Sequence, residues 1–446
     1  MDFISNKKPQ IQEMLESMGI SNLEELWRDI PKEILLSAPS RDDGLSEYEG
    51  IEEIKSMGSK NTYQHFESYI GAGAYSHYVP SIVSSVISKS GFLTAYTPYQ
   101  AEASQGLLQT IYEFQTCICR LTGLEMANAS LYDGASACGE AMLMACRINR
   151  SRRKILVAEN IHPNYLEVVR QYVEASQIEL VLIPIDESGQ IICEKFEELL
   201  DEEVAGLLLS YPNFYGAIED VRPLFEEAQK KGVINVLCAN PLVYGLYECA
   251  AKLGADVAVG DCQPFGIPLQ LGGPYAGYLS CKRKYARQIP GRVVGRTKDR
   301  AGDSGFVLTL QTREQHIRRE KATSNICSNQ ALYALASLVA MLWYGPKGIS
   351  KLALTNFQRT AYLQKNLLKL PKVQALNNDS VFNEFAVKLD MPIKEVMKHF
   401  RSKKIEPGID LGKFNLKFEN HLLINVTETK SFEALSRYLE AASEIL

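Results

Sequence analysis

Five side chains with hydroxyl or imidazole groups are concentrated in two loops between residues 66 and 100. They are Tyr75 and His77, after a Gly-Ala-Gly turn, and Tyr96, Thr97 and Tyr99, around a proline. These positions follow neither a helical nor a strand period, so core packing explains them poorly, whereas loop aromatics with polar tips often line pockets and interfaces. Their hydroxyl groups could hydrogen-bond a carboxylate or position an amine. We predict a substrate-binding or interface site; the alternative is an interface contact without a chemical role.

A second segment, residues 254–282, contains a loop that is notable for a residue type that it lacks. Two short apolar runs, Val257–Val259 and Ala276–Ser280, predict strands on either side of a loop. The prolines and glycines of this loop exclude a regular helix and allow another backbone to approach closely. From Cys262 to Pro274 the chain contains no lysine, so this loop offers no amine for covalent catalysis.

Two further features could serve a ligand. Residues Asp133–Ser136 form a small-residue loop before a helical run, and the free N–H groups of such a helix start are a potential phosphate seat. His162 could stack on a planar ring, although we interpret it as an ordinary loop histidine.

Residues 310–332 are rich in charge, and Arg313, His316 and Arg319 would share one helical face as a contact surface.

The elements that must position these residues alternate between strand and helix from residue 154 to 281. This pattern predicts a mostly parallel sheet covered on both faces, with ligands at the carboxyl ends of the strands. Before it, a helix starts at Thr97 or near Ser104 and stops at Gly123. The candidate strands are Ile155–Ala158, Leu180–Pro184, Val204–Leu209, Val233–Leu237, Val257–Val259 and Ala276–Ser280.

Three domains are expected in the 446 residues. Residues 1–65 read as a polar helical arm that wraps over a partner or caps the domain, with a polar link at residues 41–50. Residues 66–345 form the large domain with the sheet. Residues 346–446 form a smaller C-terminal α/β domain, with helices at Leu352–Leu370, Ile393–Phe400 and from Ser431, and strands at Val381–Lys388 and Leu422–Val426.

The composition of the chain argues against several classes of binding partner. The net charge is −5, which gives no electrostatic reason to bind nucleic acid or an anionic membrane. No apolar run is long enough to span a bilayer, and the first residues do not resemble a secretory signal. Ten cysteines without a CxxC pair and six histidines without a ligand motif predict reduced thiols and no metal. We therefore expect a cytoplasmic protein whose partners are proteins and small molecules.

Several long motifs resemble those of the P-protein family of the glycine cleavage system, and specifically the N-terminal half of glycine dehydrogenase (decarboxylating). They are IGAGAYSHYVPSIV, FLTAYTPYQAEASQG, SYPNFYGAIED, GDCQPFGIPLQLGGPYAG and TREQHIRREKATSNIC. The resemblance covers nearly the whole chain. It implies the fold-type I architecture of pyridoxal-phosphate (PLP)-dependent transferases, in which a lysine on the loop between the two strands named above holds the cofactor.

The resemblance also implies a division of labour between two homologous halves. The partner half, glycine dehydrogenase subunit 2, carries the lysine and the PLP. The complete enzyme, an oxidoreductase, decarboxylates glycine and passes the aminomethyl group to the lipoyl arm of H-protein. In this chain Pro264 falls where the lysine would lie, and Leu237 falls where an aspartate would hold the pyridine nitrogen protonated. The chain alone is therefore expected to bind no cofactor and to be inactive.

Two alternatives to this interpretation remain open. The chain could be an autonomous PLP-dependent lyase or transaminase that uses another lysine, such as Lys252 or Lys282. It could instead be a non-catalytic, regulatory pseudo-enzyme. Covalently bound PLP in the chain alone would favour the first alternative, and a fully active partner in the absence of this chain would favour the second.

Overall fold

The computed structural model describes residues 6–35, 44–270, 272–326, 328–377 and 380–446. The chain divides into two compact units, Met1–Gln64 and His65–Leu446. In the first unit, α1 (Lys8–Met18) ends at Gly19 and a 3₁₀ turn covers Leu23–Trp27. The polar link expected at residues 41–50 begins outside the described residues. Its last four residues belong to helix α2 (Glu47–Gly58) instead, because Ser46 and Glu49 form a capping box that starts a helix there.

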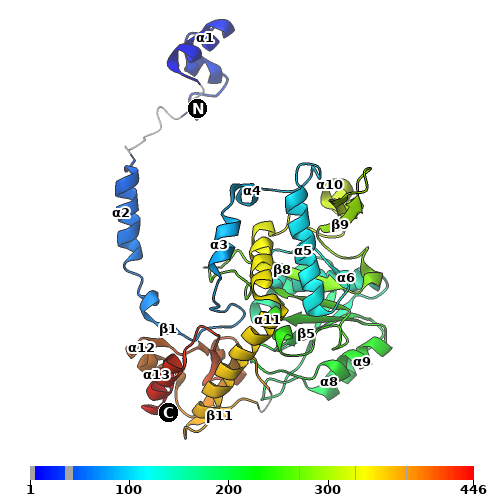
Figure 1. Ribbon diagram of the computed structural model, residues 1–446, viewed down its shortest axis with the longest axis vertical. Coiled ribbons are helices and arrows are strands. Elements are labelled where there is room, and N and C mark those ends of the chain that lie inside the picture. The colour runs from blue at the N-terminus through cyan, green and yellow to red at the C-terminus, as the bar shows by residue number, and fades with distance from the viewer. Residues whose placement is uncertain (1–5, 36–43, 271, 327, 378–379) are drawn as a thin grey trace. The chain divides into compact units, whose positions relative to one another are not determined.

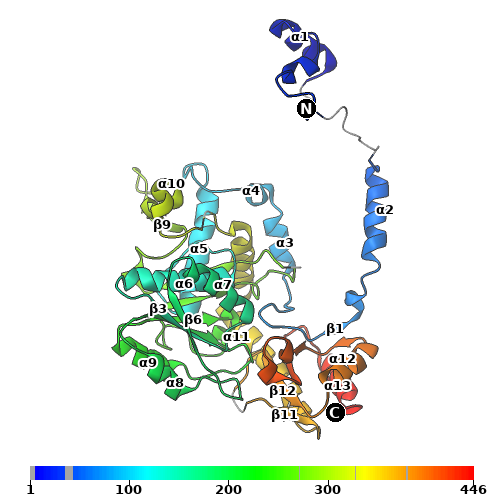
Figure 2. The same cartoon turned by 180° about the vertical axis from the view of Figure 1, so that it is seen from behind.

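The second unit is built on a seven-stranded sheet (Figures 1 and 2). Its order is β2-β8-β7-β6-β5-β3-β4; the pairs from β7 to β4 are parallel, and β8 and β2 are antiparallel. All six strands predicted for this sheet are present, and the short β2 is the one strand of the sheet that was not predicted. The strands are β2 (Met126–Ala127), β3 (Lys154–Ala158), β4 (Glu179–Ile183), β5 (Val204–Tyr211), β6 (Ile234–Ala239), β7 (Val257–Asp261) and β8 (Gly277–Cys281).

Helices cover both faces of this sheet. Successive strand residues point to opposite sides, and because both sets are apolar, both faces must be buried. Leu156 packs in a cluster with Phe114 and Leu338, whereas the next residue, Val157, packs in a second cluster with Met142. The first face is covered by α5 (Gln105–Thr122) and α11 (Ala331–Leu367), and the second by α6 (Gly134–Ile148) and α7 (Pro163–Glu174). Shorter helices α8 (Cys193–Leu199) and α9 (Arg222–Lys230) complete the crossovers.

Helix α5 resolves one of the open alternatives, since it begins after Ser104 and not at Thr97. It ends at Gly123, whose φ of 73° is the left-handed conformation that favours glycine. Two short helices before it, α3 (Ser81–Ile87) and α4 (Ser90–Leu93), were not predicted. They leave the segment from Tyr96 to Ser104 as an irregular loop.

The C-terminal part has its own four-stranded antiparallel sheet, in the order β11-β12-β15-β14. The expected helix at Leu352–Leu370 is the second half of α11, which is kinked at Gly345 before Pro346. The remaining predicted elements are present; the domain boundaries remain predictions. The elements are β11 (Val373–Ala375), β12 (Glu384–Leu389), α12 (Ile393–Ser402), β14 (Ile409–Asp410), β15 (His421–Asn425) and α13 (Phe432–Ser443). In addition, β1 (Glu67–Ser68) pairs with β13 (Ile405–Glu406).

The charged segment that follows the β9–β10 hairpin (Val293–Lys298 and Ser304–Thr309) differs from its prediction. It is divided into Gln311–Arg313, α10 (Gln315–Arg318) and Arg319–Lys321. No continuous helical face forms, because Arg319 has a φ of 52°, which ends α10. The side chains of Arg313 and His316 lie outside the described residues. No helix among the described residues is long and apolar enough to cross a membrane.

Candidate functional site

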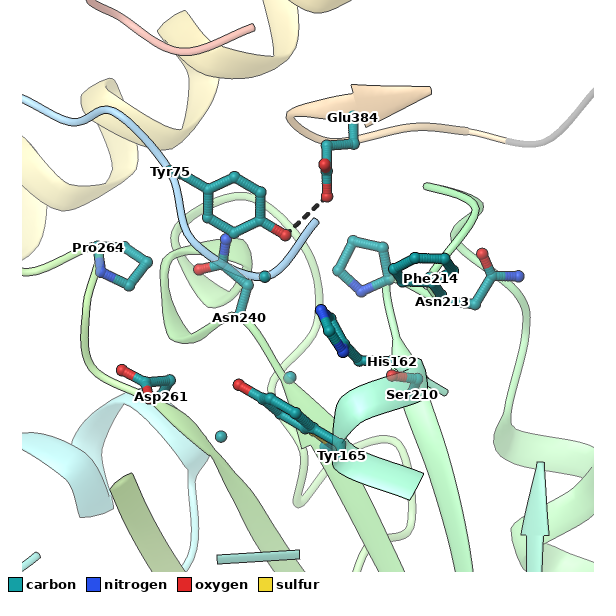
Figure 3. A pocket seen from close by; sticks show the side chains of 15 residues that line it. Tyr75, His162, Tyr165, Ser210, Asn213, Phe214, Asn240, Asp261, Pro264 and Glu384 are labelled. Atoms are coloured by element: carbon teal, nitrogen blue, oxygen red, sulfur yellow. Dashed lines mark hydrogen bonds between the residues drawn. The ribbon is translucent and has the colours of Figure 1, made fainter. Parts of the chain in front are cut away.

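A cavity of about 70 Å³ lies at the carboxyl ends of the parallel strands (Figure 3). This volume accommodates several water molecules, each of which needs about 10–15 Å³. Its walls are formed by residues at, or just after, the carboxyl ends of β3, β5, β6 and β7, as expected for a ligand site in an open α/β sheet. Glu384 at the start of β12 and Tyr75 from the N-terminal loop also line the cavity. The site thus combines segments from both ends of the second unit.

Tyr75 and Glu384 form a buried hydrogen-bonded pair. The Tyr75 hydroxyl donates to Oε2 of Glu384 at 2.7 Å, and the backbone N–H of Ala72 donates to Oε1 at 2.6 Å. Burial of the Glu384 carboxyl raises its pKa to about 7, although both hydrogen bonds oppose this shift. The Gln263 side chain holds the loop by accepting from the N–H of Tyr75 at 2.9 Å and donating to its carbonyl at 2.8 Å.

His162 lines the cavity as a neutral imidazole. Its Nδ1 accepts from the N–H of Asn164 at 3.1 Å, so Nε2 carries the proton and donates to the carbonyl of Ala72 at 2.8 Å. Burial lowers the pKa of His162, in agreement with the neutral form. Its ring contacts Tyr165 and Phe214 at centroid distances of 5.0 and 5.1 Å. His162 therefore lies in the cavity wall, with both ring nitrogens engaged by this chain.

The N-terminus of α6 is occupied by carboxyl groups of the chain itself. The N–H of Gly134 donates to Asp261 at 3.0 Å, and the N–H of Ser136 donates to Asp133 at 2.7 Å. Burial raises the pKa of Asp261 to about 7. A Cβ atom on Gly134 would lie 2.5 Å from the hydroxyl of Tyr165, which Figure 3 shows pointing towards Asp261. The predicted phosphate seat is thus filled by an acid and a phenol.

The cavity wall contains no amine. Pro264 lines the cavity, and no lysine is among its described lining residues. The amine of Lys252 pairs with Glu248 at 3.0 Å, and that of Lys282 pairs with Asp256 at 2.8 Å, beside the first residue of β7 and away from its carboxyl end. Leu237 is buried in the hydrophobic core and is not among the cavity-lining residues, which include Cys238 and Asn240 from the same segment.

His77 lies near Tyr75, with the two ring centroids 6.1 Å apart, but has a different partner. Its Nδ1 is 2.9 Å from Oε2 of Glu428, and this side chain of His77 is 2% exposed. Burial alone would raise the pKa of Glu428. The charge and hydrogen bond of His77, with the N–H of Tyr78 and the amide of Asn356, lower this pKa to about 2.

Two of the other three predicted residues, Thr97 and Tyr99, contact Arg292. The guanidinium of Arg292 donates to Thr97 at 3.2 Å and to the Tyr99 hydroxyl at 3.4 Å, and it lies over the Tyr99 ring at 5.6 Å. The Arg292 side chain is 6% exposed and lies 3.7 Å from Glu314. Tyr96 is 74% exposed. The structure therefore places four of the five predicted residues in two groups. Tyr75 and His77 lie at Glu384 and Glu428, Thr97 and Tyr99 lie at Arg292, and Tyr96 is left at the surface.

Residues with prominent roles in both groups were not predicted. Glu384, Glu428 and Arg292 approach the loops from distant parts of the chain, and no local motif indicates them. Asp261 could have been recognised, because it is the only carboxylate in the segment GDCQPFG. In the described residues, no group of three or more His, Cys, Asp or Glu side chains is arranged to hold a metal ion.

Solved structures define the class of fold. Sphingosine-1-phosphate lyase of Burkholderia pseudomallei superimposes with a TM-score of 0.66 at 16% identity over 92% of each chain. Glutamate decarboxylase of Lactobacillus brevis superimposes with a TM-score of 0.68 at 12% identity, over 92% of this chain and 94% of the enzyme. The second unit has the fold-type I architecture of PLP-dependent enzymes, as predicted.

More similar proteins identify the family. The model for "Glycine cleavage system P-protein" matches residues 1–441, and a crystal structure of glycine decarboxylase (P-protein) in inhibitor-bound form has a TM-score of 0.90 at 38% identity, with full coverage of both chains. A probable glycine dehydrogenase (decarboxylating) subunit 1 of Protochlamydia amoebophila is 54% identical over the full length of both proteins, and one from Desulfitobacterium hafniense is 44% identical. The chain belongs to the glycine cleavage system P-protein family and is similar over its whole length to subunit 1.

The residues of this chain do not fit PLP. The loop that would supply an amine has Pro264, and the helix N-terminus that would receive the phosphate donates to Asp261 and Asp133. A phosphate dianion beside two acidic groups would be repelled unless both were protonated. The chain therefore has the fold of a PLP enzyme, but the side chains at the cofactor position do not suit PLP.

Proposed function

We propose that this chain is the lysine-less half of a two-subunit glycine dehydrogenase (decarboxylating). Its partner, subunit 2, holds the PLP and the lysine. Together the two chains decarboxylate glycine and transfer the aminomethyl group to the lipoyl arm of H-protein. The observation that carries the proposal is the cavity at the strand ends, where the fold of a PLP enzyme is retained without an amine and with its anion seat filled by Asp261.

In this proposal the chain contributes by shaping the entrance for glycine and lipoyl groups from its side of the subunit boundary. Arg292 orients Thr97 and Tyr99 through direct hydrogen bonds, while the neighbouring Tyr96 is directed to the surface. A phenol hydroxyl in such a place can hydrogen-bond the carboxylate of a substrate without adding charge. Tyr75 and His77 are bound to Glu384 and Glu428, so we assign them to holding the loop in position.

The proposed location is the cytoplasm. The nine described cysteines are free thiols, which is typical of a reducing compartment. The proposed assembly contains no nucleic acid, since the chain has a net charge of −5.

The central test is the exchange of carbon dioxide with the carboxylate of glycine, measured for the chain alone, subunit 2 alone and their mixture, each with added PLP and lipoylated H-protein. We expect exchange only in the mixture. Borohydride reduction followed by mass spectrometry should place the reduced cofactor on subunit 2. Cofactor bound covalently to Lys252 or Lys282 in this chain would show an autonomous PLP enzyme, and full activity of subunit 2 alone would show that this chain is regulatory.

The assigned entrance residues can be tested in the same mixture. Tyr96→Phe and Tyr99→Phe each remove one hydroxyl, and we expect kcat/KM for glycine or for H-protein to fall by about tenfold, the effect of losing one hydrogen bond to a charged group. Tyr48→Phe is the matched control, because Tyr48 is also 74% exposed but lies in α2. Unchanged rates in both variants would remove this site assignment and leave the family assignment intact.

A further inference from the structure

A basic groove lies outside the cavity described above. Two cavities of about 520 and 540 Å³ lie next to each other, since both are lined by Arg150, Gln288 and Thr323. We define the basic groove by its six cationic side chains, which come from the end of α6, the segment after β8 and the segment around α10. They are Arg147, Arg150, Arg153, Arg287, Arg318 and Lys321.

The positive charge of the basic groove is not balanced by this chain. No aspartate or glutamate lines either cavity. Among the described residues, Arg150, Arg153, Arg287 and Lys321 form no ion pair, and Arg318 donates to the carbonyl of Thr312 at 3.0 Å. Glu140, which is buried on α6, interacts with Arg147 and offsets one of the six charges.

Several cations elsewhere on the second unit do have carboxylate partners. Lys154 pairs with Asp201, Arg222 with Asp220, and Arg401 with Glu406, all within 2.8 Å. A cluster of six cations with no carboxylate in the cavity lining contrasts with these pairs and with the net charge of −5. Their mutual repulsion costs stability, and an anionic ligand would relieve it.

Arg147 gives a second, independent indication of a ligand. Its Nη2 donates to the carbonyl of Gln288 at 3.2 Å, whereas its Nε is buried without a hydrogen-bond partner. A guanidinium presents its N–H groups as a fork that matches the two oxygens of a carboxylate. A carboxylate entering the basic groove would satisfy this buried donor.

The lining of the basic groove narrows the chemistry of the ligand. It contains no aromatic ring on which a nucleobase could stack, which disfavours nucleotides and single-stranded nucleic acid. Thr323, Ser324 and Asn325 add neutral hydrogen-bonding groups along one wall. Each of the two adjacent cavities is larger than a single carboxylate requires, so a ligand with several carboxylates, such as an acidic stretch of polypeptide, fits best.

We propose that the basic groove is the docking site for an acidic segment of a partner protein. This inference goes beyond the proposed function and does not depend on the cofactor cavity. It also gives a role to the charged segment at residues 310–332, which supplies Arg318, Lys321 and Thr323 to the groove walls.

The test uses the full chain and a fluorescently labelled octa-glutamate peptide, with binding measured by anisotropy at low and at physiological salt. We expect Arg150→Glu/Arg287→Glu to weaken binding at least about tenfold, and Arg150→Lys/Arg287→Lys to retain most of it, because charge supplies most of the attraction. The matched control is Arg120→Glu/Lys398→Glu, which makes the same change of charge at two exposed positions outside the groove. It should bind within about twofold of the unchanged chain.

Three results would overturn the proposal. They are the absence of peptide binding to the unchanged chain, an equal loss in the groove and control variants, and binding of inorganic polyphosphate in place of the peptide. The first would show that the groove does not attract carboxylates, the second that only net charge matters, and the third that the ligand is a different anion. Unchanged thermal unfolding midpoints would verify that the variants are folded.

Discussion

Glu384 is the residue on which the cavity and the N-terminal loop both depend. It accepts from Ala72 and Tyr75, and a Cβ atom on Gly71 would lie 2.2 Å from its Oε1. The position before this loop alanine must therefore remain a glycine for the carboxyl group to reach the loop. A single acidic side chain from β12 thus holds the loop that carries Tyr75 and His77.

The hydroxyl of Tyr75 should matter for stability. Tyr75→Phe leaves one oxygen of the buried Glu384 carboxyl without its donor, and we expect the free energy of unfolding to fall by about 1–3 kcal/mol in chemical denaturation. Tyr78→Phe is the control, because Tyr78 is 59% exposed. Equal stabilities of Tyr75→Phe and the unchanged protein would contradict the inferred strength of this contact.

The two buried acids predict an unusual pH dependence. The pKa values of Glu384 and Asp261 are about 7 in the folded protein, above 4.5 and 3.8 for the free side chains. At pH values between the unfolded and the folded pKa, the folded protein binds more protons than the unfolded protein does. The free energy of unfolding should therefore increase as the pH falls from about 8 to about 5. Glu384→Gln should reduce this increase by roughly 3 kcal/mol. Glutamine suits the site because the Tyr75 hydroxyl can accept as well as donate.

The pKa of Glu428 is lowered rather than raised, so this carboxylate should make the protein less stable in acid. Its folded pKa of about 2 lies below 4.5, so its contribution is present at neutral pH and is lost as the pH falls from about 5 towards 2. Stability profiles of Glu384→Gln and the unchanged protein that coincide between about pH 5 and pH 8 would show that Glu384 titrates normally.

At the scale of elements, the junction of β7, the following loop and α6 separates this chain from a PLP enzyme. Gly277 at the start of β8 lets the backbone of Asp133 approach, since a Cβ atom there would lie 2.1 Å from the Asp133 carbonyl oxygen. This contact brings the N-terminus of α6 against the end of β7, where Asp261 caps it. The loss of the lysine and the filling of the anion seat therefore occur at one place.

Restoring the amine alone should not restore cofactor binding. We expect Pro264→Lys to form no borohydride-stable adduct with PLP, because Asp261 still occupies the N–H group at the helix start. Pro264→Lys/Asp261→Ala should form an adduct that mass spectrometry detects. Pro268→Lys is the control, since it places an amine on an exposed part of the same loop. Stoichiometric labelling of Pro264→Lys alone would show that the seat is open.

At the scale of the whole molecule, the second unit should fold without the first. Within the described residues, α1 buries Leu15 and α2 buries no side chain, whereas the large hydrophobic clusters all consist of residues of the second unit. Because burial of apolar surface is the main source of stability, this core should suffice for folding. We expect a chain of residues 65–446 to unfold in one cooperative transition by calorimetry. The absence of such a transition would show that the second unit needs residues 1–64 in order to fold.

The sequence alone determined the class of fold and the absence of lysine from residues 262–274. Strand and helix periods are local, so the six main strands, the end of α5 at Gly123 and most C-terminal elements could be predicted from neighbouring residues. Pro264 could be located because it lies within a motif. The start of α2 and the division of residues 311–321 were misjudged, since a capping box and a positive φ at Arg319 override composition.

Only the tertiary structure decided which residues meet at the site. Glu384, Glu428 and Arg292 reach the tyrosine-rich loops from distant segments, and the basic groove draws its charges from three separate elements. Such contacts depend on how the sheets and helices pack, which leaves no local pattern in the chain. The same reason explains why the helix start at Asp133–Ser136 could be predicted, whereas its contact with Asp261, 127 positions after Gly134, could not.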